Sequence, residues 1–331
     1  MYRRFTALAM CLLSACVVAI TAGRASAQPI DRTFVIVMEN QSFDEVIGTV
    51  DGNGVPNTPY ITNLALRNGL ATLYFGVTHP SLPNYLSMIA GDYLGVQDDN
   101  DSCYAIPSYT PGCHAFSNPN LVDLLVARHI SWAAYMQSMP STGFRGDRWP
   151  LTGPKLYAQK HNPFVYFKDI ALNPAQLQRI KPLNSLSILS HDLASPMTAP
   201  RFVYIVPDQC HDMHGTTTCS ATPSLLKQGD GYVRDLISRI TASPSFTRNS
   251  VIYLTWDEND YSGNLGCCDS PAIGGGHVAT IAVSPLITAP YRSQKMFNHY
   301  SLLATIENAY GLPHLGHSGD APRVQPLDLL P

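Results

Sequence analysis

The chain has 331 residues, of which 45% are hydrophobic and 14% are charged, so it can bury one large core or two modest ones. Lysine and arginine number 21 and aspartate and glutamate 24, which gives a formal net charge of −3. This near-neutral balance, without a basic block, argues against nucleic acid as a partner, because such binding needs a phosphate-neutralising surface.

The first 27 residues have the pattern of an export signal. Two arginines precede an apolar run over residues 5–21, and residues 25–27 read Ala-Ser-Ala, a small-x-small cleavage site. We expect cleavage after Ala27, a secreted or periplasmic location, and a single domain over residues 28–331. A lipoprotein anchored through Cys16 is a lower-ranked alternative, because the apolar run continues past this residue. No other stretch approaches the ~20 apolar residues that span a bilayer.

Cysteine usage agrees with export, since the number outside the signal is even. The short spacings make Cys103–Cys113 and Cys210–Cys219 plausible bridges. The neighbours Cys267 and Cys268 are harder to pair with each other because such a bond is strained. A thiolate metal site is the rival interpretation, but no C-x-x-C pair supports it. The sequence leaves the connectivity open.

Predicted strands and helices alternate along the mature chain. The short apolar runs that indicate strands lie at 32–38, 71–75, 130–136, 202–206, 251–256 and 278–283. Helices are predicted at 59–68 with Gly69 as C-cap, from Ser81 onward, at 121–129, at 231–241, and at 300–310 with Gly311 as its stop. Segments 98–119 and 144–200 are rich in Pro, Gly and Ser and are expected to be long loops. This order predicts an α/β fold with a mostly parallel central sheet, helices on both faces and long loop insertions.

The stretch Thr78–Gly91 has the pattern of a turn that carries a nucleophile. Ser81 occupies a helix N-cap position and Pro83 lies just inside the first turn, where these residue types are favoured. A hydroxyl there faces unpaired N–H groups and the positive end of the helix dipole. Such a place favours an alkoxide and attracts phosphate.

Acidic residues follow three of the predicted strands. Glu39-Asn40 follow the first, Asp208 comes shortly after the run at 202–206, and Asp257-Glu258 follow the run at 251–256. Ligands of open parallel sheets bind beyond the carboxyl ends of the strands, so these side chains are expected to meet. The oxygen ligands of Glu39, Asn40, Asp257 and Glu258, together with the Ser81 hydroxyl, suit a hard divalent cation.

Histidines supply a second layer of candidates. His161, His211, His214 and His277 lie in polar, loop-like contexts, and His277 follows three glycines that allow a ligand to come close. We expect His79 to support the turn and His299 to be structural. The acidic loop at residues 98–101 is a possible calcium site, but simple solvation is the preferred interpretation.

Several separate motifs resemble those of the bacterial phosphoesterase family, from about Arg32 to about Gly311. This family includes secreted acid phosphatases and phospholipases C of the phosphatidylcholine type and belongs to the alkaline-phosphatase superfamily. The motifs are Glu39-Asn40-x-x-Phe43-Asp44, His79-Pro80-Ser81-x-Pro83-Asn84-Tyr85, Lys160-His161-x-Pro163, Asp212-Met213-His214 and Trp256-Asp257-Glu258.

The resemblance implies a role for each matched residue. Ser81 is expected to be the nucleophile, His161 and His214 to assist catalysis, and Asn40, His211 and His277 to bind substrate. The implied metal ligands are Glu39, Asn40, Ser81, Asp257 and Glu258. A second metal or direct phosphate contacts would use Asp208, Asp212, His214 and His277. Two departures from two-metal relatives put the second ion in question: Glu258 replaces a usual histidine, and the spacing of the Asp208, Asp212 and His214 group differs.

These expectations combine into a hypothesis of a secreted, metal-dependent acid phosphatase. Ser81 would form a phosphoserine, a divalent cation (Mg, Ca, Mn or Zn) would activate its hydroxyl, and a protonated His161 or His214 would favour mildly acidic pH. The substrate would be a small-molecule or lipid phosphate ester. The alternatives are a phosphodiesterase of the phospholipase C type and, from another class, a secreted binding protein that has lost catalysis.

Overall fold

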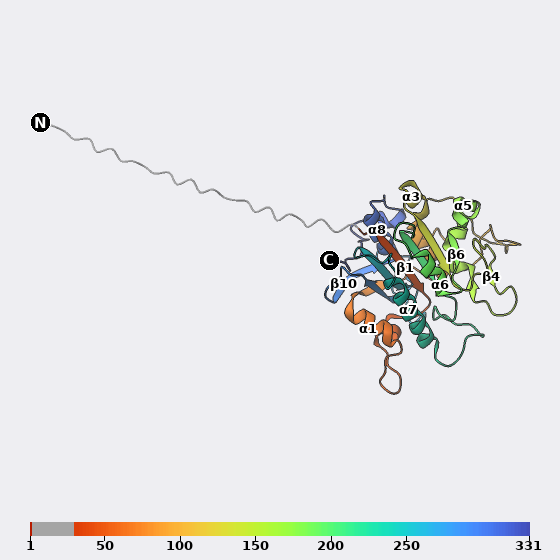
Figure 1. Cartoon of the computed structure of the whole chain (residues 1–331), viewed down its shortest axis with the longest axis horizontal. Coiled ribbons are helices and arrows are strands. Elements are labelled where there is room, and N and C mark those ends of the chain that lie inside the picture. Colours follow the sequence, from red (N-terminus) through yellow and green to blue (C-terminus); the bar gives the residue numbers. More distant parts are fainter. Residues whose placement is uncertain (2–29) are drawn as a thin grey trace.

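An eight-stranded sheet runs through the computed structural model, which describes Met1 and residues 30–331 (Figure 1). The predicted signal segment, the cleavage site at Ala27 and Cys16 lie outside the described residues. The strand order is β10-β2-β9-β8-β1-β7-β3-β6, and every strand except β9 runs in the same direction. The strands are β1 Arg32–Met38, β2 Gly69–Phe75, β3 Trp132–Met136, β6 Ile180–Pro182, β7 Phe202–Val206, β8 Ser250–Trp256, β9 His277–Val283 and β10 Tyr291–Asn298.

Helices cover the sheet in two groups. α1, α6 and α7 pack together on one side, and α2, α3 and α8 pack on the other (Figure 1). The α-helices are α1 Pro59–Arg67, α2 Ser81–Ala90, α3 Leu121–Ala127, α4 Lys168–Ala171, α5 Pro174–Leu177, α6 Leu186–Asp192, α7 Leu225–Thr241 and α8 His299–Tyr310. Shorter turns are η1 Asp44–Gly48, η2 Gln159–His161, η3 Pro163–Tyr166 and η4 Gly316–Gly319, and a separate ribbon pairs β4 Arg148–Trp149 with β5 Tyr157–Ala158.

The central strand β1 explains why the functional residues meet. All seven of its residues are buried, because β7 and β8 flank it and helices cover both faces. Its β-branched residues suit such a position. Since β1, β7 and β8 are parallel, the residues that follow them emerge at one edge of the sheet. The predicted α/β fold class with a mostly parallel sheet is thereby confirmed.

Several details differ from the sequence predictions. Gly69 begins β2, and the extended Asn68 ends α1, so the predicted glycine C-cap is wrong. α7 begins at Leu225 rather than at residue 231. The segment 144–200 contains short strands and helices as well as loops. The edge strand β10 was not predicted because exposed polar residues interrupt its apolar pattern.

Three disulfides join the six cysteines of the described chain. Cys103–Cys113 and Cys210–Cys219 form the two local bridges that their spacing suggested, and Cys267 pairs with its neighbour Cys268. Among the described helices, none combines the length and the apolar character needed to cross a bilayer.

Asn298 ties the loop over residues 259–276 to the body of the fold. Its side-chain oxygen caps α8 by accepting from the N–H groups of Tyr300 and Ser301, at 3.0 and 3.3 Å. Its amide nitrogen donates to the carbonyls of Cys267 and Cys268, at 3.0 and 3.1 Å. One buried side chain therefore satisfies both a helix start and a loop.

We predict that Asn298→Ala lowers the free energy of unfolding by about 1–3 kcal/mol, because it removes a helix cap and leaves buried groups unpaired. Urea denaturation followed by circular dichroism measures the change. The matched control is Asn173→Ala, which removes the exposed cap of the four-residue helix α5 and is expected to cost less than about 1 kcal/mol. Equal losses in the two variants would contradict the anchoring role.

Candidate active site

Ser81 lies at the start of α2, completely buried, between two carboxylates and an ammonium group. Its Oγ is 3.1 Å from Oε2 of Glu39 and 3.2 Å from Oε1 of Glu258. It also accepts from Nζ of Lys160 at 3.2 Å. The N-cap is Pro80, so Ser81 is the first helical residue rather than the cap that the sequence predicted. The hydroxyl still lies at the positive end of the helix.

The turn that presents Ser81, residues 76–81, is held by the side chain of Asn84. Its Oδ1 accepts from the N–H groups of Val77 and Thr78, at 2.8 and 3.1 Å, and its Nδ2 donates to the Thr78 carbonyl at 2.6 Å. Gly76 lets the turn approach β8, since a Cβ there would lie 2.7 Å from the Asp257 carbonyl oxygen. The polypeptide therefore fixes Ser81 beside the end of β8.

Four buried carboxylates gather at this edge of the sheet: Glu39, Asp212, Asp257 and Glu258. The backbone connects them, because the N–H of Glu39 donates to the Asp212 carbonyl and that of Asp257 to the Met38 carbonyl. Asn40 bridges two of them. Its N–H donates to Oδ1 of Asp257 at 3.2 Å, and its amide donates to Oε1 of Glu258 at 3.1 Å.

Burial raises the pKa of all four carboxyl groups. For Glu39 it raises the pKa to about 8, against the opposing effect of Lys160 and Tyr85. For Asp212, Asp257 and Glu258 burial is likewise the largest cause of the raised pKa, and Glu39 adds to it for both aspartates. If all four were ionised, they would carry more negative charge than Lys160 balances, and the raised pKa values reflect this cost.

The oxygen atoms here fit a divalent cation. Oδ2 of Asp212, Oδ2 of Asp257 and Oδ1 of Asn40 are buried and have no hydrogen-bond partner in the structure. A buried polar atom without a partner is costly, and a hard cation takes oxygen ligands of this kind. The unpartnered oxygens of Asn40 and Asp257 thus fit part of the predicted ligand set Glu39, Asn40, Ser81, Asp257 and Glu258, in which Glu39 and Glu258 already accept from Ser81.

Lys160 and Asp99 also lie beside Ser81, and the sequence interpretation selected neither of them as a site residue. Lys160 donates to Asp99 at 2.8 Å as well as to Ser81, and Asp99 accepts from the N–H of Leu82 at the start of α2. Burial alone would lower the pKa of Lys160, but Glu39 and Asp99 outweigh it and the pKa is raised. The loop at residues 98–101 is therefore not simply solvated. Lys160 could have been selected from the sequence, because it is part of the family motif that also contains His161.

His79 also belongs to the cluster. Its Nδ1 lies 2.5 Å from Oε2 of Glu258, and its ring stacks on Tyr261 with centroids 3.9 Å apart. The predicted supporting role for His79 is consistent with these contacts. His299 is buried and its Nε2 lies 2.5 Å from the Asp257 carbonyl, which agrees with a structural role.

His161 and His214 lie on the Asp212 side of the cluster. Nε2 of His161 is 3.3 Å from Oε1 of Glu39, and the two imidazole centroids are 6.3 Å apart. Burial lowers the pKa of His161 well below its usual range, with Lys160 and His214 adding to the effect. Partial burial also lowers the pKa of His214. Burial therefore disfavours the protonated form of the two histidines, and Lys160 is the cation that hydrogen-bonds to Ser81.

The structure does not bring the remaining predicted residues to Ser81. Asp208 accepts from Ser138 at 2.7 Å and lies 2.8 Å from Nδ1 of His211, so it organises the turn after β7. The ring of His277 stacks on Phe43 at 4.6 Å, and its Nε2 lies 2.9 Å from the Thr72 carbonyl. Among the described residues, no hydrogen bond or ion pair links His211 or His277 to Ser81.

Two other groups of polar side chains lie away from Ser81. Asp269, His317 and Asp320 have ligand atoms within 4.8 Å of one another, the one such trio found among the described residues. His317 already pairs with Asp320 and Asp269 with Arg323, so this trio is internally balanced.

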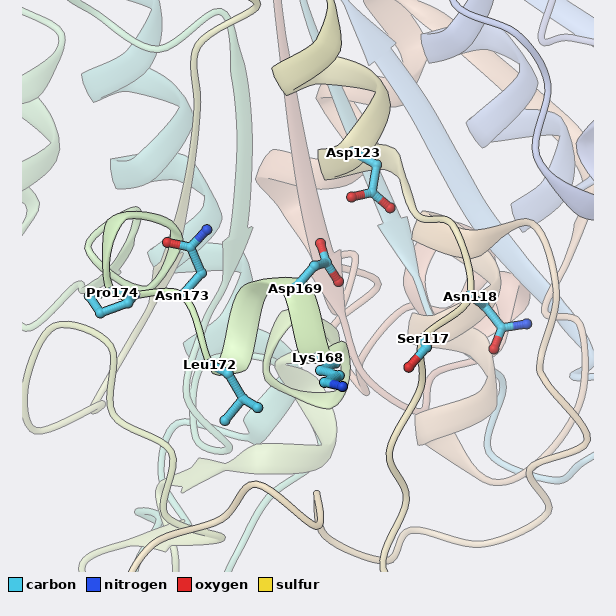
Figure 2. A pocket seen from close by; sticks show the side chains of 8 residues that line it. All are labelled: Ser117, Asn118, Asp123, Lys168, Asp169, Leu172, Asn173 and Pro174. Carbon is cyan, nitrogen blue, oxygen red and sulfur yellow. The ribbon is translucent and has the colours of Figure 1, made fainter.

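A hollow of about 660 Å³ contains none of the predicted site residues (Figure 2). Its carboxylates Asp123 and Asp169 both accept from the amide of Asn120, which caps α3. Burial and the neighbouring Asp169 raise the pKa of Asp123 to about 6. These groups have a structural task, and we place the chemistry at Ser81.

Comparison with solved structures supports the fold that this geometry defines. A protein of the alkaline phosphatase superfamily from Vibrio parahaemolyticus superposes with a TM-score of 0.55 at 11% identity, covering 86% of this chain and 68% of the other. Murine ectonucleotide pyrophosphatase/phosphodiesterase 5 superposes with a TM-score of 0.56 at 11% identity, covering 91% of this chain and all of the other. At such identities the likeness concerns the fold alone.

Residues 54–313 match the Phosphoesterase family, and the chain belongs to this family. It is 30% identical to a phosphate-repressible acid phosphatase of Penicillium chrysogenum, over 86% of this chain and 60% of the relative. It is 27% identical to a phosphatidylinositol-3-phosphatase of Mycobacterium tuberculosis, over 88% of this chain and 80% of the relative. The chain thus spans about three fifths of the fungal protein. Because the relatives include fungal proteins, the family assignment extends beyond the bacterial members that the motifs suggested.

For the metal-free protein we predict a fall in thermal stability as pH rises from about 5 to about 8. The folded state holds the pKa of Glu39 at about 8 instead of 4.5, so its protonated form is favoured and this stability is lost as pH passes the folded value. A divalent cation should restore stability more at high pH, because carboxylates bind metal when deprotonated. Melting temperatures in EDTA and in MnCl₂ measure both effects.

Two variants sharpen this test. Glu39→Gln should flatten the pH slope and weaken the response to Mn²⁺, whereas Asp235→Asn, which changes an exposed carboxylate, should behave like the wild type. Buried Glu307, whose pKa burial raises to about 7, adds to the slope in every variant, so the difference between variants is the informative quantity. An undiminished Mn²⁺ response in Glu39→Gln would contradict the proposed ligand set.

Proposed function

We propose that this chain is a secreted, metal-dependent phosphatase that hydrolyses phosphomonoesters through a phosphoserine at Ser81. One observation carries the proposal: a buried serine hydroxyl at a helix start touches two carboxylates of raised pKa and one lysine. A carboxylate of raised pKa is a better proton acceptor, and the helix start and Lys160 favour an anionic ligand. Membership of the Phosphoesterase family and the similarity to a fungal acid phosphatase support this reaction class.

The residues of this chain account for each part of the reaction. Glu39 or Glu258, in its ionised form, accepts the Ser81 proton as the Oγ–P bond forms and the P–O bond to the leaving alcohol breaks. Lys160 and the N–H groups of α2 offset the negative charge on the phosphoryl oxygens. The alkoxide that leaves is protonated by water or by a neighbouring acid. Water then hydrolyses the phosphoserine, releasing phosphate and regenerating the serine.

A divalent cation held by Glu39, Asn40, Ser81, Asp257 and Glu258 would supply Lewis-acid activation and charge neutralisation. The candidate ions are Mg, Ca, Mn and Zn, and the oxygen-rich ligand set favours the hard ions among them. Asp212, with its unpartnered Oδ2, and His214 are candidates for a further phosphate or metal contact.

Export and domain organisation complete the proposal. The N-terminal pattern predicts cleavage after Ala27, and three disulfides in the described chain are typical of an oxidising compartment. One continuous hydrophobic core contains residues from Ile30 to Leu329, which supports a single domain over residues 28–331. The substrate is a small-molecule or lipid phosphate ester.

We predict that Ser81→Ala lowers the turnover of p-nitrophenyl phosphate by at least about a thousandfold, because the nucleophile is lost. The matched control is Ser87→Ala on the same helix, whose hydroxyl donates to the Pro83 carbonyl, and it should retain most of the activity. Steady-state assays from roughly pH 4 to 9, with and without EDTA, measure the effect.

Trapping adds a second readout. Wild-type protein quenched in acid during turnover should carry one phosphoryl group on the peptide that contains Ser81, as seen by mass spectrometry. Near-normal turnover of the Ser81→Ala protein would sink the proposed mechanism. Activity confined to phosphodiesters or phosphocholine esters would instead identify a phospholipase C type of enzyme, and silence on every phosphate ester would favour a binding protein.

We predict that Lys160→Gln reduces kcat by about a hundredfold with a smaller change in KM, because Lys160 stabilises charge that develops in the transition state. Lys160→Arg should recover part of the loss, since it keeps the charge but not the geometry. Lys155→Gln is the control for the loss of a neighbouring positive charge that makes no hydrogen bond to Ser81. Equal losses for Lys155→Gln and Lys160→Gln would contradict a specific role.

A further inference from the structure

The loop over residues 259–276 forms one wall of the Ser81 site. Its two ends meet, because the N–H of Asn259 donates to the Gly275 carbonyl. The same end is attached to the turn that presents Ser81, since Gly275 donates to the Gly76 carbonyl and Gly76 donates to that of Gly276. The loop is therefore fixed relative to the nucleophile.

Tyr261 belongs to this loop and lies next to His79, a member of the cluster around Ser81. One face of its ring stacks on His79, with the ring planes 21° apart, and His79 contacts the same Glu258 that touches Ser81. Yet 57% of Tyr261 is exposed, so its ring is covered on one face and open on the other. Burial, followed by Glu258 and Asp99, raises the pKa of Tyr261 to about 12.

The backbone holds Tyr261 in a conformation that bulky residues rarely adopt. Its φ is +65°, and its N–H donates to Oδ1 of Asn259 at 3.0 Å. Strain of this kind at a large residue is often found at ligand sites, where the surrounding structure maintains it. Two further exposed apolar side chains, Leu265 and Ile273, belong to the same loop, and its backbone brings their segments together through the bond from Gly276 to the Leu265 carbonyl.

We propose that Tyr261 forms a subsite for the leaving group, where its open ring face packs against the ring of an aromatic alcohol or phenol esterified to phosphate. The inference rests on the proposed phosphatase function, and it adds a preference within it. An aromatic platform beside the nucleophile would bind a planar apolar group and would gain little from a short aliphatic one.

The test compares two phosphomonoesters that both release a primary alcohol, benzyl phosphate and ethyl phosphate. We expect Tyr261→Ala to lower kcat/KM for benzyl phosphate by about three- to tenfold relative to ethyl phosphate, the range typical of one aromatic contact. Tyr261→Phe should keep the wild-type ratio because it keeps the ring. The control Tyr291→Ala removes a tyrosine of 45% exposure at the opposite end of the strands, and it should leave the ratio unchanged.

The ratio separates a subsite from a merely structural role. If Tyr261 only supports His79, Tyr261→Ala will slow both esters equally, and the subsite is overturned while the phosphatase function stands. If the wild type hydrolyses neither these esters nor p-nitrophenyl phosphate, the proposed function fails and the subsite fails with it. The proposal is supported if Tyr261→Ala selectively loses activity on benzyl phosphate while Tyr261→Phe and Tyr291→Ala do not.

Discussion

The cost of burying carboxylates at one sheet edge shapes the whole site. Glu39, Asp212, Asp257 and Glu258 lie in contact with a hydrophobic core, where an ionised group is stable only with cations or hydrogen-bond donors nearby. Lys160 supplies one positive charge and Asn40 supplies two donors. One positive charge and two donors are too few to stabilise four ionised carboxylates. The site therefore has room for the charge of a divalent cation, and without one the pKa values of the carboxylates are raised.

The carboxylates are buried together because the residues that follow parallel strands emerge at the same edge of the sheet. β1, the most central strand of this set, places Glu39 and Asn40 between the ends of β7 and β8, and the turn after β2 brings Ser81 to them. The supporting residues are neutral and rigid: Asn84 holds the turn, and His299 holds the Asp257 backbone. The unfavourable burial of charge is thus confined to side chains whose backbone is held in place by several hydrogen bonds.

Much of this arrangement follows from sequence pattern, and the rest depends on contacts that pattern does not encode. Apolar runs predicted the strands and hence the meeting of Glu39, Asp257 and Ser81, because parallel strands share one edge. Lys160 and Asp99 were missed since both lie in irregular segments far apart in the chain, where no periodicity indicates which side chains meet. His277 is a different case: three glycines suggested a ligand site, and the half-buried ring packs against Phe43 and Phe75 without contacting Ser81.

Charge at Ser81 therefore has a different origin from the one that residue types alone suggest. Histidine is the usual group for mildly acidic chemistry, but burial lowers the pKa of His161 and so favours its neutral form. Lys160 keeps its charge throughout that range, because Glu39 and Asp99 raise its pKa. The groups that titrate are the carboxylates, and a cation that binds them lowers their pKa values. Part of the pH dependence of the reaction would then come from proton and cation occupancy of the carboxylate cluster.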